Sequence, residues 1–203
     1  MKIDPKDLDW KHAHELLLSA VVPRPIAFVS TIGPDGVCNL APFSLFAPMS
    51  IKPCVVGVGI GGKRDGSKKD TLVNIEFAKD FVVNLVTDEL AEAMNQSSKE
   101  YPSHVDEFQE VGLTAGQSDF VKSPRVAESP VNLECKLIQV LQFGELPRLS
   151  SFAVGEVVRV HVQDELWAEG VVKIAKLKIV ARLGEELYTR TTDIFEMKRP
   201  DAL

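Results

Sequence analysis

Short runs of β-branched and aromatic residues, separated by turn signals, dominate the chain from Pro25 onward. The first three runs are PIAFVSTI, VCNLAPFSLF and CVVGVGI, and the turn sequence GPDG separates the first two. Closely spaced runs of this kind predict strands that pair along the chain as a β-meander. Two later runs, VNLECKL and GEVVRVHV, alternate apolar and polar residues, as strands with one buried face do. The second run places Arg159 and His161 together on its polar face.

Two segments with helical spacing interrupt the predicted strands. The first is KKDTLVNIEFAKD, and the second is DELAEAMNQSSKEY, in which Leu90, Met94 and Tyr101 recur on one helical face. The helices do not alternate regularly with the strands, so the pattern favours an α+β, mainly β fold over repeated βαβ units. No repeat or shift in composition divides the 203 residues. We therefore expect one barrel-like domain over residues 1–203, with helical insertions.

The charge balance and the N-terminus argue against several classes of protein. A net charge of −6 and a pI near 5.3 disfavour a nucleic-acid-binding protein, which needs a basic face. The N-terminal sequence MKIDPKDLDWKHAHELL has no apolar core of signal-peptide length, and no later run could span a membrane. We therefore expect a cytoplasmic protein. The three cysteines form no C-x-x-C, and His12 and His14 lack a third ligand nearby, so we predict no metal site.

A glycine-rich run invites a phosphate-binding interpretation. Gly57, Gly59 and Gly62 match G-x-G-x-x-G, but the polar sequence KRDGSKKD follows where an apolar helix should begin. A P-loop is also disfavoured, because Arg64 replaces the Ser or Thr that holds magnesium. We interpret these glycines as a strand end that leaves the sheet through a loop.

The segment after this run predicts a helix start. Ser67 precedes Asp70 by three residues, which is the spacing of a capping box, so a helix should begin within 67–71. Free N–H groups at such a start, together with Lys68, Lys69 and Thr71, could bind one phosphate. A solvated, capped helix end is the alternative interpretation.

Residues 103–130 form a longer connection than compact domains usually contain, and we interpret them as a lid or an edge of a site. His104, Phe108 and Phe120 are its candidate wall residues.

Several motifs, in a fixed order over about residues 21–200, resemble the flavin reductase-like family. These motifs are PRPIAFVST, DGVCNLAPFSLF, KKDTLVNI, FVVNLV, ARLGEELY and FEMKRP. The family comprises FMN-binding split barrels and includes flavoredoxin. The resemblance implies a six-stranded antiparallel split barrel of Greek-key type. It also implies a homodimer that binds one FMN at each edge of the dimer interface.

The resemblance also assigns cofactor-binding residues. The V-S-T motif, the N-L-A-P-F-S segment and the K-D-T motif would line the flavin, with K-D-T at its phosphate. Two C-terminal residues match positions that the family keeps near the flavin or the dimer contact, with less motif support. The implied residues are Ser30, Thr31, Asn39, Leu40, Ala41, Pro42, Ser44, Lys69, Asp70, Thr71, Arg182 and Tyr188.

The implied activity is that of an oxidoreductase in which NADH or NADPH reduces FMN. The reduced flavin would pass electrons to free flavin, a redox partner protein or a small acceptor. Because flavin carries its own redox centre, no catalytic side chain is expected. Thr31 or the N–H groups of residues 39–41 would stabilise charge at the flavin N1 and C2 carbonyl. One alternative is a flavoredoxin-like electron carrier or flavin-binding module without a nicotinamide site. Another is a split barrel adapted to pyridoxal phosphate or haem.

Overall fold

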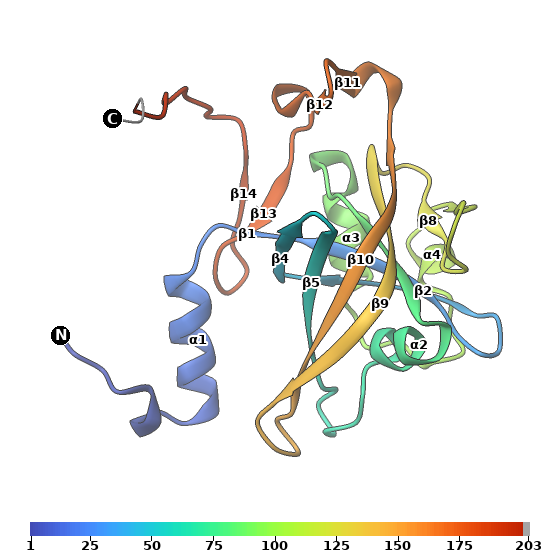
Figure 1. The fold of residues 1–203 in the computed structure, drawn as a ribbon. Helices are drawn as coiled ribbons and strands as arrows, with labels where there is room; N and C mark the ends of the chain where they lie inside the picture. Colours follow the sequence, from blue (N-terminus) through green and yellow to red (C-terminus); the bar gives the residue numbers. More distant parts are fainter. Residues whose placement is uncertain (201–203) are drawn as a thin grey trace.

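The computed structural model describes residues 1–200, and its centre is a strongly curled antiparallel sheet (Figure 1). This sheet has seven strands in the order β3-β2-β6-β9-β10-β5-β4. β3 (Cys38–Phe43) and β4 (Leu45–Ile51) lie at opposite ends of that order, although only Ser44 separates them in sequence. One residue spans at most about 3.6 Å, so the two edges must come together. The sheet therefore closes into a split barrel.

The other elements are helices, further barrel strands and small separate sheets. The helices are α1 (Trp10–Ala20), α2 (Asp70–Ala78), α3 (Ala91–Gln96) and α4 (Glu107–Glu110). The other barrel strands are β2 (Ala27–Ile32), β5 (Cys54–Gly61), β6 (Asp80–Asn84), β9 (Val131–Phe143) and β10 (Ser150–Val162). A second sheet combines β1 (Arg24–Pro25), β13 (Val180–Arg182) and β14 (Tyr188–Arg190). Two short pairs are β7 (Ala115–Gly116) with β8 (Arg125–Val126), and β11 (Trp167–Ala168) with β12 (Val171–Val172).

The antiparallel split barrel is confirmed, but the strand count and the meander were wrong. The run VCNLAPFSLF divides at Ser44, because β3 pairs with β2 whereas β4 pairs with β5. This division makes seven strands rather than six. The meander is only local, since β6 lies between β2 and β9 and pairs with both.

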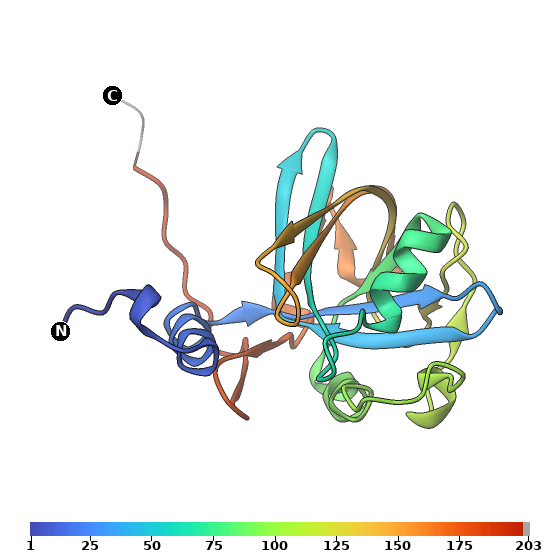
Figure 2. The ribbon, with the colours of Figure 1, turned by 90° about the horizontal axis from the view of Figure 1, so that it is seen from below.

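Two hydrophobic cores lie on opposite faces of β2, which explains its nearly continuous apolar sequence. Ala27 and Val29 point into the barrel core, to which α2 also contributes. Phe28 belongs to an outer core that includes residues of α3 and α4. Figure 2 shows β2 and β3 between α2 on one side and α3 and α4 on the other. The same strands therefore connect both layers.

The second predicted helix is shorter than its sequence pattern. A 3-10 turn, Asp88–Leu90, leads into α3, which ends at Gln96. The Ser97 hydroxyl donates to the Met94 carbonyl at 2.8 Å, at the end of the helix. Leu90 and Met94 are buried, but Tyr101 lies beyond the helix.

The interpretation of the G-x-G-x-x-G glycines as a strand end followed by a loop is only partly correct. Gly57 and Gly59 lie inside β5, whereas Gly62 lies in the following loop. A Cβ at Gly57 would overlap the Phe152 ring, and one at Gly59 would lie 2.7 Å from the Leu45 Cβ. Close approach of neighbouring side chains therefore explains the two strand glycines.

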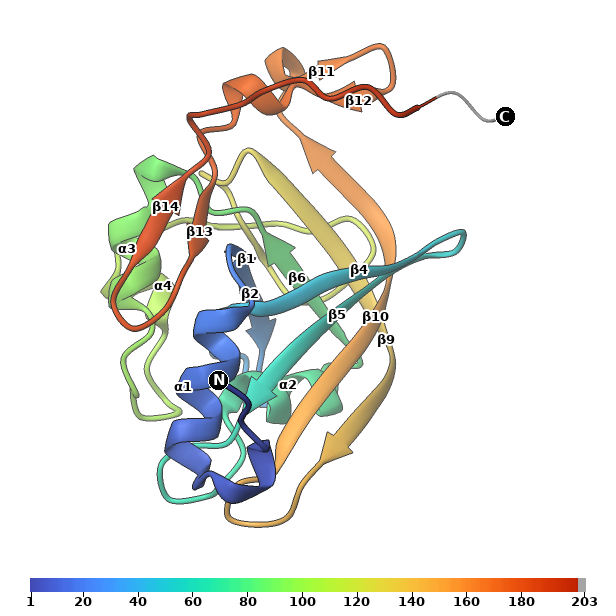
Figure 3. The same cartoon turned by 90° about the vertical axis from the view of Figure 1, so that its left-hand side faces the viewer.

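One side of the molecule exposes apolar side chains. No residue of α1 is buried, and Leu17 is 60% exposed. Figure 3 shows α1, β4 and the C-terminal segment from this side. Ile51 of β4 and Phe195 of the C-terminal segment are also exposed. Of the helices in residues 1–200, none is long and apolar enough to cross a membrane.

Candidate functional site

Two adjoining cavities lie along β3 and its connection to β4. The larger cavity has a volume of about 700 Å³, and the smaller one has about 60 Å³. Pro42, Phe43 and Ser98 line both cavities, so they form one groove. The smaller end of the groove meets the start of α2, and the larger end lies between α1 and the β1–β13 strand pair.

The start of α2 lies at the smaller end of the groove. The helix begins at Asp70, within the predicted range, but Lys69 at its N-cap makes no capping hydrogen bond from its side chain. The expected capping box is absent because the Ser67 hydroxyl donates to Asp65 and the Asp70 carboxylate pairs with Lys63 at 2.9 Å. Within residues 1–200, no hydrogen bond engages the backbone N–H groups of Asp70 and Thr71. These donors are therefore available to an anion in the groove.

Asn39 of β3 connects this helix start to the segment that follows α3. Glu107 of α4 accepts hydrogen bonds from Asn39 Nδ2 at 2.8 Å and from the Leu40 N–H at 3.1 Å. The Asn39 Oδ1 accepts hydrogen bonds from the hydroxyls of Thr71 at 2.7 Å and Thr31 at 3.4 Å. Burial raises the pKa of Glu107. The hydrogen bonds that Glu107 accepts from Leu40 and Asn39 act in the opposite direction. Glu107 thus fixes the orientation of the Asn39 amide.

The larger end of the groove contains a buried arginine. Arg24 is only 5% exposed, and its Nε donates to the Ser44 Oγ at 3.3 Å. Its Nη1 donates to the carbonyls of Leu18 and Val21 at the end of α1. Burial and the neighbouring Arg182 both lower the pKa of Arg24. The groove therefore has two arginines at this end and helix-start donors at the other.

Most of the predicted binding residues line the groove. The smaller end includes Asn39, Ala41, Pro42, Lys69, Asp70 and Thr71, and the larger end includes Pro42, Ser44, Arg182 and Tyr188. These residues lie together, as the predicted cofactor site requires, and their role in binding FMN stays a prediction.

Three predicted residues do not line either cavity. Leu40 belongs to the outer core, and the Thr31 hydroxyl lies behind Asn39 and accepts a hydrogen bond from Asn74 at 3.1 Å. The Ser30 hydroxyl donates to the Pro124 carbonyl and accepts from Asn84. Consecutive residues of a strand point to opposite faces, so Ser30 and Thr31 cannot both face one ligand. In this structure Thr31 does not line the groove, and its contact with a ligand stays a prediction.

Several groove residues escaped the sequence analysis. His12 and His14 of α1 line the larger cavity, because α1 forms one of its walls. Arg24 belongs to the motif PRPIAFVST. Its only signal in the sequence was its position as a single arginine before an apolar strand. The sequence held no signal for Glu107, whose partner lies 68 residues away.

The segment 103–130 serves the groove only through α4. Phe108 is buried in the outer core and Phe120 is 52% exposed, and none of His104, Phe108 and Phe120 lines the groove. Phe108 is not a wall residue of the groove because it faces the outer core, and His104 and Phe120 line neither cavity.

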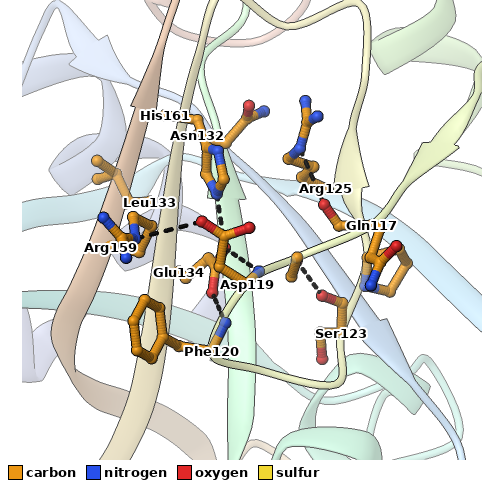
Figure 4. A network of polar contacts seen from close by, with 12 residues as sticks. Gln117, Asp119, Phe120, Ser123, Arg125, Asn132, Leu133, Glu134, Arg159 and His161 are labelled. Atoms are coloured by element: carbon orange, nitrogen blue, oxygen red, sulfur yellow. Dashed lines mark hydrogen bonds and ion pairs between the residues drawn. The ribbon is translucent and has the colours of Figure 1, made fainter.

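The rest of the segment is anchored elsewhere, at the outer surface of β9 and β10 (Figure 4). The buried Glu134 carboxylate accepts the N–H groups of Asp119 and Phe120, both at 2.7 Å, and contacts the His161 Nε2 at 2.6 Å. Arg159 pairs with Asp119 at 3.3 Å. Asp119, Glu134 and His161 have the chemistry of metal ligands. Because the Glu134 oxygens are already engaged, we interpret the cluster as a loop anchor.

Comparisons with known proteins agree with the fold. The sequence model of the flavin reductase like domain matches residues 18–174. The uncharacterized protein BH2278 of Halalkalibacterium halodurans is 38% identical over 202 residues, covering 98% of this chain and 97% of that protein.

Two solved structures resemble the chain over nearly its full length. The nitrilotriacetate monooxygenase component B from Bacillus cereus superposes with a TM-score of 0.93 at 29% identity, covering 97% of this chain and 98% of that one. The 2-nitrobenzoate 2-nitroreductase NbaA of Pseudomonas fluorescens superposes with a TM-score of 0.89 at 31% identity, covering 98% and 96%.

Proposed function

This chain belongs to the flavin reductase like domain family, and from that premise we propose that it is an FMN-binding oxidoreductase reduced by NADH or NADPH. The observation that carries the proposal is the continuous groove between the start of α2 and the arginine-lined cavity. A groove of this size lies within the usual range for small-molecule and cofactor sites.

The residues at the smaller end fit the phosphate of FMN. The free N–H groups of Asp70 and Thr71, together with the Lys69 ammonium, provide an anion site at a helix N-terminus. The Asp70 carboxylate would repel a phosphate, but Lys63 pairs with it at 2.9 Å. The Thr71 hydroxyl donates to Asn39, so we assign it to holding the helix start rather than to direct phosphate contact.

The residues at the larger end fit the ring of the flavin. Ile26, Phe43 and Met94 supply an apolar wall, and the Ser44 hydroxyl supplies a hydrogen-bonding group. When bound, FMN supplies the redox chemistry by accepting a hydride and giving up electrons. The chain's own residues would bind and orient the cofactor and limit the access of water. Because the flavin would carry the redox chemistry and the protein would only bind and orient it, we expect no catalytic side chain.

The names of two similar structures support redox chemistry for this chain. One is component B of a monooxygenase and the other is a nitroreductase. At 29% and 31% identity over nearly the whole chain, these proteins favour an oxidoreductase over a barrel adapted to pyridoxal phosphate or haem. The electron donor and the final acceptor are part of our proposal: a reduced nicotinamide nucleotide, and free flavin, a redox protein or a small molecule.

We also propose that the protein is a homodimer. The elements α1, β4 and the C-terminal segment lie on one side of the molecule (Figure 3), and each carries exposed apolar side chains. Clusters of exposed apolar side chains commonly mark interaction sites. Since α1 also lines the groove, a second copy packed on this side would lie beside the cofactor site.

Anaerobic absorption spectroscopy of the FMN-loaded protein tests the proposed activity. We expect NADH or NADPH to bleach the flavin band rapidly, and dithionite serves as the control for a reducible flavin. Bleaching by dithionite alone would identify an electron carrier or a flavin-binding module instead. Failure to retain any flavin after reconstitution would contradict the assignment of the groove to FMN.

A further inference from the structure

Two arginines face each other across a strand pair at the larger end of the groove. Arg24 of β1 lies directly opposite Arg182 of β13 in the antiparallel register. Both side chains line the cavity of about 700 Å³. Like charges directly opposite one another destabilise a pair of strands. The arrangement therefore needs a compensating negative group.

The protein itself does not supply that negative group. Within residues 1–200, no carboxylate forms an ion pair with Arg24 or Arg182. Two acidic residues line the cavity, but Glu15 lies beside Lys11 at 3.8 Å, and Glu185 offers Arg182 only its backbone carbonyl. Both guanidinium groups are therefore left without a paired carboxylate among residues 1–200.

Neutral groups hold both guanidinium groups in fixed positions. Arg24 is anchored by Ser44 and by backbone carbonyls, and these contacts leave its Nη2 without a hydrogen-bond acceptor among the described residues. Arg182 donates to the Tyr188 hydroxyl and lies 4.5 Å from the centre of that ring. Anchoring of this kind reduces the entropy that is lost when an anion binds. The pair is thus organised in advance for an oxyanion.

We propose that Arg24 and Arg182 bind the carboxylate or phosphate of the molecule that exchanges electrons with the flavin. This inference rests on the proposed function, because it places an anionic substrate in the same groove as FMN. The planar guanidinium forks match the paired oxygens of a carboxylate or phosphate. Apolar residues of the same cavity, among them Leu18, Ile26 and Met94, would contact the uncharged part of the substrate. The site therefore selects small organic anions.

Isothermal calorimetry on the protein, with and without FMN, tests this anion site. Benzoate is compared with its neutral counterpart benzamide, and nicotinamide mononucleotide is compared with nicotinamide riboside, which lacks the phosphate, so the two pairs separate a carboxylate source from a phosphate source. We expect at least one anion to bind about tenfold more tightly than its counterpart. Arg182→Gln should abolish this preference, while Arg182→Lys, which keeps the charge but loses the fork, should retain part of it.

Arg190→Gln is the matched control, because Arg190 belongs to the adjacent strand β14 but pairs with Asp88 outside this cavity. It should leave the anion preference unchanged. Circular dichroism of each variant verifies folding. Equal binding of both members in both pairs, or an intact preference in folded Arg182→Gln, would overturn the proposal. A loss of FMN affinity in Arg182→Gln with an unchanged anion preference would assign the arginines to the flavin and also overturn it. Failure of wild-type protein to bind FMN would instead reject the proposed function.

Discussion

Glu107 links α4 to the groove through a single side chain, although sequence patterns did not reveal it. Glu107→Gln would place an amide NH₂ against either the Leu40 N–H or the Asn39 Nδ2, which both need an acceptor. An unsatisfied buried donor costs about 1–3 kcal/mol. Because Asn39 orients Thr71, we expect the dissociation constant of FMN to rise about tenfold in a fluorescence titration. Glu110→Gln, on the exposed part of the same helix, is the control, and equal FMN affinity in both variants would refute this role.

Gly57 tests the interpretation of the glycine-rich run. Gly57→Ala would force a Cβ into the Phe152 ring and to within 2.5 Å of the Met49 Sδ. Such overpacking should lower the free energy of unfolding by about 1–3 kcal/mol. Gly61→Ala is the matched control in the same strand, because no heavy atom lies within 4 Å of its added Cβ. Chemical denaturation that finds both variants equally stable would contradict the packing explanation.

At the residue scale, the sequence predicted the composition of the groove better than its geometry. The helix start that carries Lys69 and Thr71 was predicted within 67–71 from neighbours in sequence, although the capping box that indicated it is absent. The opposition of Arg24 and Arg182 depends on strand register across 158 residues, which local patterns do not encode. The motif match also placed Ser30 and Thr31 on one ligand, whereas strand geometry turns them to opposite faces.

At the scale of elements, β9 shows both the strength and the limit of sequence patterns. The alternation in VNLECKL correctly predicted a strand, and Asn132 and Glu134 share its polar face. Alternation alone suggests that such a face is solvated. Both residues are instead buried, because segment 115–126 folds over them through contacts with Asp119, Phe120 and Val126.

The anchor formed by Glu134 predicts a specific pH dependence of stability. Burial alone would raise the pKa of Glu134, but hydrogen bonds from Asp119, His161 and Phe120 hold it below its ordinary value. The unfolded chain therefore binds more protons than the folded one between the folded pKa and about pH 4.3, the ordinary glutamate pKa. The stabilisation is present above that pH and is lost as the pH falls through the folded pKa.

Glu134→Gln removes this titration. We expect a lower free energy of unfolding near neutral pH and a flatter decline in acid, measured by urea denaturation from about pH 7 to about pH 3. Glu156→Gln, an exposed residue of β10, should keep the wild-type decline. An unchanged acid slope in Glu134→Gln would show that the anchor does not couple protonation to folding.

At the scale of the whole molecule, the exposed apolar side predicts self-association. Leu17 and Phe195 are 60% and 77% exposed, so replacing both by Ser should leave the monomer fold intact and weaken the dimer. Size-exclusion chromatography with light scattering should give the mass of two chains for the wild type and a shift toward one chain for the variant. Phe77→Ser is the control, because Phe77 is 55% exposed on α2. A wild-type protein with the mass of one chain would contradict the dimer.

We expect FMN to occupy the groove with its phosphate at the start of α2. The most direct measurement compares the dissociation constants of FMN and riboflavin, which lacks the phosphate, in the wild type, Lys69→Ala and Lys68→Ala. A charge-assisted phosphate contact is worth about 1.5–3 kcal/mol, so wild-type protein should prefer FMN by at least about tenfold. Lys69→Ala should reduce this preference for FMN over riboflavin. Lys68→Ala should leave the preference unchanged, because Lys68 pairs with Glu76 outside the groove. Equal affinities for FMN and riboflavin in the wild type, or a preference for FMN that Lys69→Ala leaves unchanged, would show that the phosphate does not bind at the start of α2.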